Sequence, residues 1–234
     1  MLINGGKMEK VELNLDSWQR VFSAYVVAAS FAGKFLYNEP DKLFLENLSK
    51  TVEISNDWPM KSRNTDTDEG IKILNEIFLN ISSLNFDEIE EDYNSLFVGP
   101  TVLAVPWESV YKTVDKTLFG EPTAEVRKFY AKYNLKAPKL LSEPDDHIGL
   151  ELLFLSHLCS LGLEKIRNKD YVELWAVVED IRIFSNSHIL SFGFKCLKDV
   201  EDNCKTDFFV GVAKLTKGLL QALKEDFIEG SYAY

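Results

Sequence analysis

The chain has 234 residues, of which 46% are hydrophobic, and its formal net charge is −11. This length and apolar content are sufficient to bury one large core, or two small ones that share an interface. The negative charge repels polyanions and attracts cationic partners, so nucleic acid is excluded as an expected ligand.

Cysteine usage and hydropathy indicate a cytoplasmic protein. The three cysteines, Cys159, Cys196 and Cys204, have no C-x-x-C spacing, which predicts reduced and mostly buried thiols. No stretch approaches the roughly 20 uninterrupted apolar residues that cross a bilayer, so we do not expect an integral membrane protein. Residues 1–14 lack the apolar region of a secretion signal and are predicted to form a flexible tail. Met8 is an alternative natural start, in which case the preceding residues are a cloning remnant.

Apolar residues recur at spacings of three and four along most of the chain, while alternation with a period of two is sustained nowhere. This pattern predicts an all-α fold, which we expect to be a compact orthogonal bundle of about nine to eleven helices. The predicted helices, in chain order, cover residues 17–37, 41–48, 66–81, 87–97, 123–133, 148–166, 171–184, 188–200 and 206–228.

A polar linker over residues 136–142 suggests a division of the chain. We predict an N-terminal helical lobe over residues 15–135, a short hinge over 136–147 and a C-terminal lobe over 148–234. Because the linker is short, the two lobes are expected to share an interface. A second irregular segment, Val98 to Pro106, is apolar rather than polar, which indicates a groove wall or a buried crossing.

Several kinds of site are excluded by spacing. Residues 66–70 resemble a calcium loop, but the glycine arrives one position early and the final glutamate is absent, so helix capping by Asp66 to Asp68 is expected instead. The histidines and cysteines are not clustered as zinc ligands, and the common nucleophile and nucleotide motifs are absent. The only arrangement that could support acid–base chemistry is His147 with Asp145, Asp146 and Glu151.

Residues 143–147, with the sequence E-P-D-D-H, form the most unusual segment of the chain, and we call them the EPDDH motif. They place three carboxylates and one of only three histidines immediately before an apolar helix. Pro144 and one aspartate are suited to start that helix. This local role gives no reason for His147, so the motif points to a further function.

Two further segments complete a pattern: residues 93–100, with the sequence Y-N-S-L-F-V-G-P, and residues 106–111, with the sequence P-W-E-S-V-Y. Together with the EPDDH motif, they resemble the TorD/DmsD/NarJ family of redox-enzyme maturation chaperones, and most closely its TorD/DmsD branch. Residues 118–130 also match the family pattern. The resemblance covers about residues 15–228 and is strongest over 93–158.

The resemblance implies a cytoplasmic, non-enzymatic chaperone that binds the twin-arginine signal peptide of a molybdopterin-containing oxidoreductase of the DMSO/TMAO reductase type. Such a chaperone aids folding, cofactor insertion and proofreading of the precursor before Tat export. Further partners implied are the Tat translocase and molybdenum-cofactor biosynthesis proteins. The family implies no cofactor beyond weak GTP binding, and either a monomer or a domain-swapped dimer.

The residues expected to bind the peptide fall into two groups. Guanidinium groups need carboxylates, and the apolar part of a signal peptide needs an aromatic groove. The expected charged group is Glu143, Asp145 and Asp146, and the expected groove is Leu96, Phe97, Pro106, Trp107 and Tyr111. By resemblance, recognition positions of the family correspond to Leu96, Phe97, Pro106, Trp107, Pro144, Asp146 and His147. Alternatively, Leu96, Phe97 and Tyr111 are simply part of the core.

Two other functions stay open at this stage. The first is a NarJ-like assembly factor that acts on the mature part of a reductase, and the second is a guanine-nucleotide-binding helper. The sequence also departs from the family pattern in two places. Tyr93 stands where some relatives have tryptophan, and the apolar loop between Phe97 and Pro106 is shorter than in some members, so the preferred signal peptide is expected to differ.

Overall fold

The computed structural model describes residues 15–230, and this part of the chain is helical without a β-sheet. The expected all-α bundle of nine to eleven helices is therefore confirmed. The α-helices are α1 (Leu15–Tyr37), α2 (Lys42–Thr51), α3 (Ile54–Asp57), α4 (Thr65–Leu79), α5 (Phe86–Tyr93), α6 (Glu108–Lys112), α7 (Glu121–Lys132), α8 (Ile148–Arg167), α9 (Tyr171–Phe184), α10 (Leu190–Asn203) and α11 (Asp207–Leu223). A 3₁₀ turn, η2 (Ile81–Ser83), and three π-helical turns, η3 (Asn94–Val98), η4 (Ser185–Ile189) and η5 (Lys224–Ile228), complete the elements.

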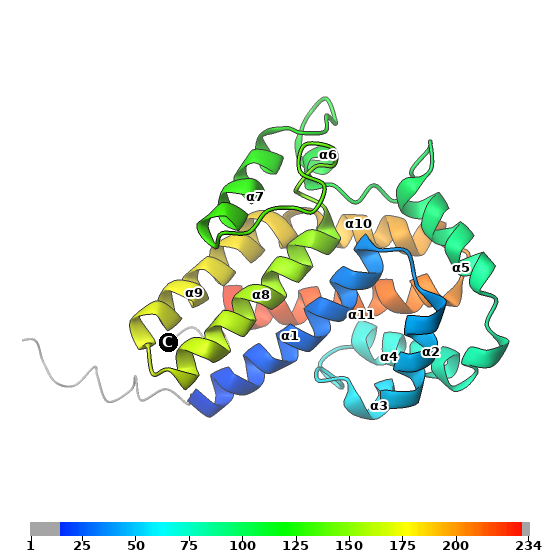
Figure 1. Ribbon diagram of the computed structural model, residues 1–234, viewed down its shortest axis with the longest axis horizontal. Helices are drawn as coiled ribbons and strands as arrows, with labels where there is room; N and C mark the ends of the chain where they lie inside the picture. The colour runs from blue at the N-terminus through cyan, green and yellow to red at the C-terminus, as the bar shows by residue number, and fades with distance from the viewer. Residues whose placement is uncertain (1–14, 231–234) are drawn as a thin grey trace, which may run out of the picture.

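Two long helix pairs organise the core. Helix α1 packs along α8, and α4 packs along α11, while α10 and α9 cover the remaining sides of α11 and α8 (Figure 1). Each pair joins a helix of the N-terminal half to a helix of the C-terminal half, and the buried apolar side chains form one cluster. The predicted division into two lobes stays a prediction, but the halves share this core.

The α1–α8 contact is close because two glycines meet there. A Cβ atom on Gly33 would lie 2.7 Å from the carbonyl oxygen of Gly149 and 2.8 Å from Cγ of Leu153. A Cβ on Gly149 would meet Gly33 and Tyr37 at similarly short distances. The two helix backbones therefore touch directly, at the first turn of α8.

Helix starts differ from the predicted ones by a few residues, for reasons of capping. Asn64, rather than Asp66 to Asp68, caps α4, since its side chain accepts a hydrogen bond from the backbone N–H of Thr67 at 2.9 Å. Helix α7 begins at Glu121, two residues before the predicted start at Thr123, with Pro122 in its first turn. Thr123 therefore lies inside the helix, and its hydroxyl bonds to a residue outside α7, as described below.

The sequence did not predict the π-helical turns near the ends of the last helices. The helix expected over 206–228 is α11 followed by η5, and the one expected from His188 is the end of η4 followed by α10. Single-turn π-helices give no clear periodic signal in the sequence.

Of the expected thiols, Cys159 and Cys196 are buried and Cys204 is partly exposed, and all three are unpaired. Within residues 15–230, no helix is both long and apolar enough to cross a membrane.

We expect Gly33→Ala to lower the free energy of unfolding by about 2 kcal/mol. The added methyl group must push the α1 and α8 backbones apart, and this cost outweighs the gain of about 1 kcal/mol in helix propensity. Urea denaturation measures the difference. As a control, Gly120→Ala places its methyl no closer than 3.3 Å to a flexible side chain and should change stability by less than about 1 kcal/mol. Equal effects of the two variants would contradict the close contact.

Candidate functional site

The structure brings the EPDDH motif and the P-W-E-S-V-Y segment into direct contact. Trp107 and His147 form an isolated antiparallel β-bridge. On either side of it, the N–H of Glu108 donates to the Asp146 carbonyl at 2.9 Å, and the N–H of Ile148 donates to the Pro106 carbonyl at 2.8 Å. The pairing predicted from two distant segments is thus a physical junction, where α6 begins beside the start of α8.

The side chain of Asp146 holds this junction together. Its carboxylate accepts hydrogen bonds from the backbone N–H of Ser109 at 2.6 Å and from the hydroxyl of Thr123 at 2.7 Å. Asp146 is completely buried, so these partners replace the water that a carboxylate would otherwise bind. One side chain therefore ties α6 and α7 to the residues that precede α8.

Asp145 is also completely buried, and it pairs with Arg127 of α7. The guanidinium donates from Nε at 3.1 Å and from Nη2 at 2.7 Å, a two-point contact that raises the pKa of Arg127. The hydroxyl of Tyr130 donates to the Asp145 carbonyl at 3.2 Å. In this structure, the guanidinium that Asp145 binds belongs to the chain itself.

His147 is the N-cap of α8, which corrects the prediction that Pro144 and one aspartate start this helix. Its Nδ1 accepts a hydrogen bond from the N–H of Gly149 at 3.0 Å. An acceptor nitrogen requires the neutral imidazole, and burial lowers the pKa of His147 to about 3. The ring is packed edge-on against Tyr37 and Trp107, at centroid distances of 5.0 and 6.1 Å. His147 is therefore a neutral structural group at physiological pH.

Glu143 is the accessible carboxylate of the motif. It forms an ion pair with Lys139 at 3.1 Å and accepts a hydrogen bond from the hydroxyl of Tyr37 at 3.4 Å. The Lys139 ammonium also lies over the ring of Tyr37, 5.7 Å from its centroid. Burial and then the neighbouring Glu143 raise the pKa of Tyr37 to about 12. This corner thus already holds one cation against a carboxylate and an aromatic ring.

The expected groove residues do not form an open aromatic groove. Leu96 and Phe97 are buried, and the Phe97 ring packs 5.9 Å from Phe209 of α11. Tyr111 is partly buried, and its hydroxyl donates to Asp199 at 2.8 Å. Pro106 and Pro144 are buried as well, whereas Trp107 is only partly buried. Whether these residues bind a peptide stays a prediction.

Exposed apolar side chains are concentrated in the connections around this junction. These segments are the last residue of η3 with the connection to α6 (98–107), the connection from α6 to α7 (113–120) and the connection from α7 to α8 (133–147), which Figure 1 shows on the side of the molecule where α8 begins. They carry seven of the fourteen large hydrophobic side chains that are exposed within residues 15–230, namely Val98, Leu103, Val114, Leu118, Phe119, Leu140 and Leu141. Exposed apolar side chains that gather in loops often mark an interaction site. We call these seven side chains the loop surface.

Several residues of the junction were not predicted from the sequence. Arg127, Thr123 and Glu108 are spaced along the chain as ordinary surface residues of amphipathic helices, so periodicity gave no signal for their polar partners. A second histidine, His188, is buried beside the junction, with its Nδ1 2.9 Å from Glu108. Glu151 was considered as an acid–base partner of His147, but its burial was not foreseen. Its side chain is completely buried inside the protein.

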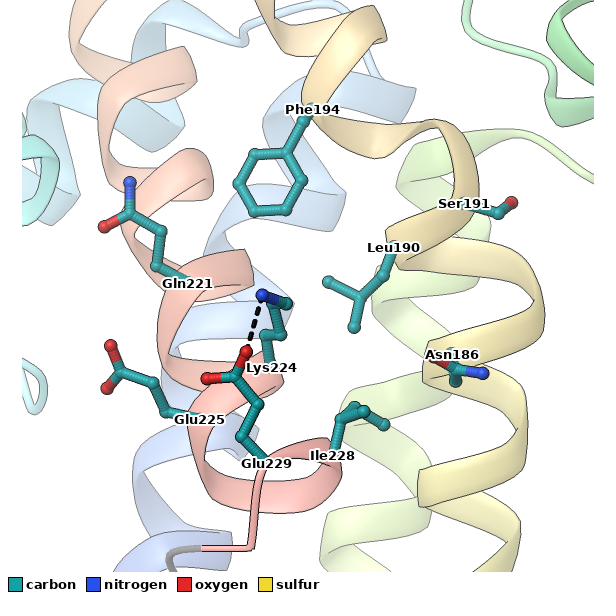
Figure 2. A pocket seen from close by; sticks show the side chains of 9 residues that line it. All are labelled: Asn186, Leu190, Ser191, Phe194, Gln221, Lys224, Glu225, Ile228 and Glu229. Carbon is teal, nitrogen blue, oxygen red and sulfur yellow. Dashed lines mark ion pairs between the residues drawn. The ribbon is translucent and has the colours of Figure 1, made fainter.

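A pocket of about 650 Å³ lies elsewhere, between the start of α10 and the end of α11. Figure 2 shows Leu190 and Phe194 on one wall, facing Lys224 and Ile228 across the pocket. Lys224 forms an ion pair with Glu229 at 2.6 Å. None of the predicted peptide-binding residues lines this pocket, so it offers a second location against which the loop surface can be tested. No group of ligating side chains that could hold a metal ion occurs within residues 15–230.

Comparison with known proteins assigns the chain to a family. The sequence model of the family described as "Nitrate reductase delta subunit" matches residues 62–198, more than half of the chain. The chain belongs to this family. Its curated relatives include a probable Tat proofreading chaperone DmsD of Haemophilus influenzae (28% identical over 139 residues, covering 59% of this chain and 61% of that protein) and a chaperone protein TorD of Aliivibrio salmonicida (27% over 190 residues, covering 77% and 81%). The chaperone protein YcdY of Escherichia coli is 25% identical over 202 residues, covering 85% of this chain and 93% of that protein.

These matches confirm the predicted membership of the TorD/DmsD/NarJ redox-enzyme maturation family. The relatives are named as chaperones rather than enzymes, in agreement with the expected non-enzymatic role. The chain matches less than two thirds of the length of the Haemophilus protein. The comparisons therefore establish the family of this chain, and its activity, its client and its binding site are proposals that are treated separately below.

We expect Asp146→Asn to lower the free energy of unfolding by about 2 kcal/mol, because a neutral amide oxygen accepts the Ser109 N–H more weakly than a carboxylate does, and the NH₂ group keeps the Thr123 contact only if that hydroxyl turns from donor to acceptor. Urea denaturation would measure this loss. The control, Asp202→Asn, removes a carboxylate that is more than half exposed and pairs only with Lys198, and should change stability by less than about 1 kcal/mol. A stable Asp146→Asn variant would show that the junction does not depend on this carboxylate.

We also expect His147 to contribute to loss of stability in acid. Its pKa is about 3 when folded against an ordinary value of 6.5, so below pH 6.5 the unfolded chain binds a proton that the folded chain does not. The contribution of His147 to the free energy of unfolding has its full value above about pH 6.5. Below this pH, the contribution falls by up to about 1.4 kcal/mol per pH unit until about pH 3. His147→Asn keeps a helix-capping side chain and should show a shallower decline in thermal or urea melts. Parallel declines for the two proteins would contradict a neutral buried imidazole.

Proposed function

We propose that this protein is a cytoplasmic, system-specific chaperone that binds the twin-arginine signal peptide of a molybdopterin-containing oxidoreductase and retains the precursor during folding and cofactor insertion. The observation that supports this proposal best is the loop surface, whose side chains lie in the connections that lead into α6, out of α6 and into α8, the elements that form the junction of the two family motifs. Relatives named Tat proofreading chaperones support the same class of client.

The loop surface suits the apolar part of such a peptide. A signal peptide presents a continuous apolar segment, which gains free energy when it is removed from water. Val114, Leu118 and Phe119 extend from the connection between α6 and α7, and Leu140 and Leu141 from the connection that leads to α8. Loops that carry exposed apolar side chains can adapt to peptides of different shape without disturbing the helical core.

The paired arginines need accessible carboxylates, and the structure favours Glu143 for this role. Asp145 and Asp146 are buried and already bonded to Arg127, Ser109 and Thr123. Glu143 is instead paired with Lys139, whose side chain is 64% exposed and whose ammonium lies over the ring of Tyr37. A surface ion pair of this kind contributes at most about 1 kcal/mol, so an incoming guanidinium can displace it at small cost. Arginine gains a two-point contact with Glu143 and stacks on the ring.

Long-range electrostatics support the same partner. The net charge of −11 attracts a cationic peptide and raises its rate of association. Binding should therefore weaken as ionic strength increases, since salt screens exposed charges.

Calorimetry with a synthetic twin-arginine signal peptide tests the proposal. Leu141→Ser should weaken binding at least about tenfold, or about 1.4 kcal/mol, because it removes an exposed apolar contact. Leu79 at the end of α4 is a matched control: both leucines are 73% exposed, so Leu79→Ser should leave affinity unchanged. Absence of binding by the wild-type protein, or equal losses in both variants, would overturn the assignment.

The charged end is tested separately. Glu143→Gln should weaken binding of the twin-arginine peptide about tenfold but should have little effect on a peptide in which both arginines are replaced by alanine, because that peptide has no cation for Glu143 to bind. Glu229→Gln is the comparison variant, since it removes a carboxylate next to apolar side chains in the pocket between α10 and α11. If only Glu229→Gln weakens binding, the peptide binds in the pocket between α10 and α11, and the assignment of the binding site to the loop surface is wrong.

A NarJ-like role is the second candidate, because the matching family is described by the nitrate reductase delta subunit. In that case, the protein would bind the mature part of a reductase subunit instead of its signal peptide. Crosslinking to a leaderless reductase subunit, together with no calorimetric signal for the signal peptide, would favour this alternative. Weak GTP binding and a domain-swapped dimer stay predictions.

A further inference from the structure

Glu151 is the least compensated polar group in the described part of the protein. It lies in the first turn of α8, is completely buried, and neither of its carboxyl oxygens has a hydrogen-bond partner. A buried carboxylate without partners is strongly unfavourable, so such a group is retained in its neutral form. The hydroxyl oxygen of Ser109, in α6, is also buried and without a partner.

The N–H of Glu151 donates to the His147 carbonyl at 3.0 Å, so Glu151 lies one helical turn from the junction. The charged and titratable groups that influence it electrostatically are Glu108 and Lys112 of α6 and Asp146 of the EPDDH motif. Glu151 in turn influences Tyr130 of α7 and Cys196 of α10. Two of these neighbours are carboxyl groups, so ionised Glu151 would add a third negative charge to a region removed from water.

The ammonium of Lys112 is already paired with Glu108. The Glu108 carboxylate accepts from Lys112 at 2.8 Å, contacts His188 at 2.9 Å and accepts from the hydroxyl of Ser191 at 3.2 Å. Burial raises the pKa of Glu108, but the bonds from His188 and Lys112 outweigh it and lower the net value. For Glu151, burial and then Glu108 and Asp146 raise the pKa well above the ordinary value. One carboxyl group of the pair is thus charged and the other neutral.

Helix α6 is the element that can respond to this charge. It has five residues and is held by the bonds of its first amides to Asp146 and by the contacts of Glu108 with η4 and α10. Helix α8 is long and packed along α1, so it has little freedom to move. We propose that Glu151 is the proton-binding group of a latch, in which α6 stays docked on the EPDDH motif, α7 and α10 while Glu151 is protonated and undocks when Glu151 ionises.

The direction of the pH dependence follows from the proton count. At neutral pH, the docked state holds a proton on Glu151 that the open state, with Glu151 in water, releases above about pH 4.5. Docking therefore weakens as pH rises. Because Trp107 precedes α6 and Val114 follows it, undocking would rearrange one side of the loop surface. The latch itself requires no peptide, so its test does not depend on the proposed function.

Native-state hydrogen exchange measures the docking directly. The amides of Glu108 and Ser109, which donate to Asp146, report on α6, and the amides of α11 report on global unfolding. After correction for the intrinsic exchange rate, protection of the α6 amides should fall at least about tenfold between pH 6.5 and pH 9, while α11 remains protected. Glu151→Gln, which cannot ionise, should abolish this fall. Glu164→Gln, on the exposed face of α8, should behave as the wild type.

Two results would overturn the latch. One is constant protection of the α6 amides in the wild-type protein, and the other is the same pH dependence in Glu151→Gln. If Glu151→Gln does not fold, Glu151→Met replaces it in the same experiment, since methionine needs no hydrogen bond. Carbon-13 NMR of the Glu151 carboxyl group provides an independent measurement in the wild type. Titration above pH 7 supports the proposal, and titration in the ordinary range of glutamate refutes it.

Discussion

The bond network around Asp146 determines how the rest of the junction is arranged. Its backbone carbonyl and carboxylate receive the first two amides of α6, and its carboxylate also receives the hydroxyl of Thr123 from α7. A buried carboxylate is tolerated only when such donors surround it. The requirement fixes where α6 and α7 lie, and through them the three connections that carry the exposed apolar side chains.

This arrangement separates structure from recognition within one short motif. Asp145, Asp146 and His147 are buried and bonded within the chain, so they shape the site without offering free groups to a ligand. Glu143, the first residue of the motif, keeps an accessible carboxylate. A motif common to a family can thus include residues needed for folding next to residues available for binding, and substitutions at the two kinds of position should differ in their effect on stability.

The fold was largely predictable from the sequence, whereas the site was predictable only in part. Helix type and number followed from periodicity, since a three-to-four spacing of apolar residues is a local property. The expectation that both motifs contribute to one site followed from their resemblance to a family, whereas the hydrogen-bonded contact between them was not predicted. Burial of Asp145 and Asp146 could not be inferred, because it depends on Arg127 and Thr123, which are distant along the chain and have no periodic signal of their own. The capping role of His147 depends on a neutral ring, which only the packed environment produces.

The glycine contact between α1 and α8 has a consequence for assembly. Gly33 and Gly149 bring together backbones from the two halves of the chain, next to the segment that would have to extend if two copies exchanged halves. Exchange would require this dry, close-packed seam to separate completely in both copies before it could form again between them. Monomers and exchanged dimers would then be separated by a barrier comparable to that of unfolding, and each form would persist as it was first made. The ratio between them would record the conditions of synthesis rather than an equilibrium.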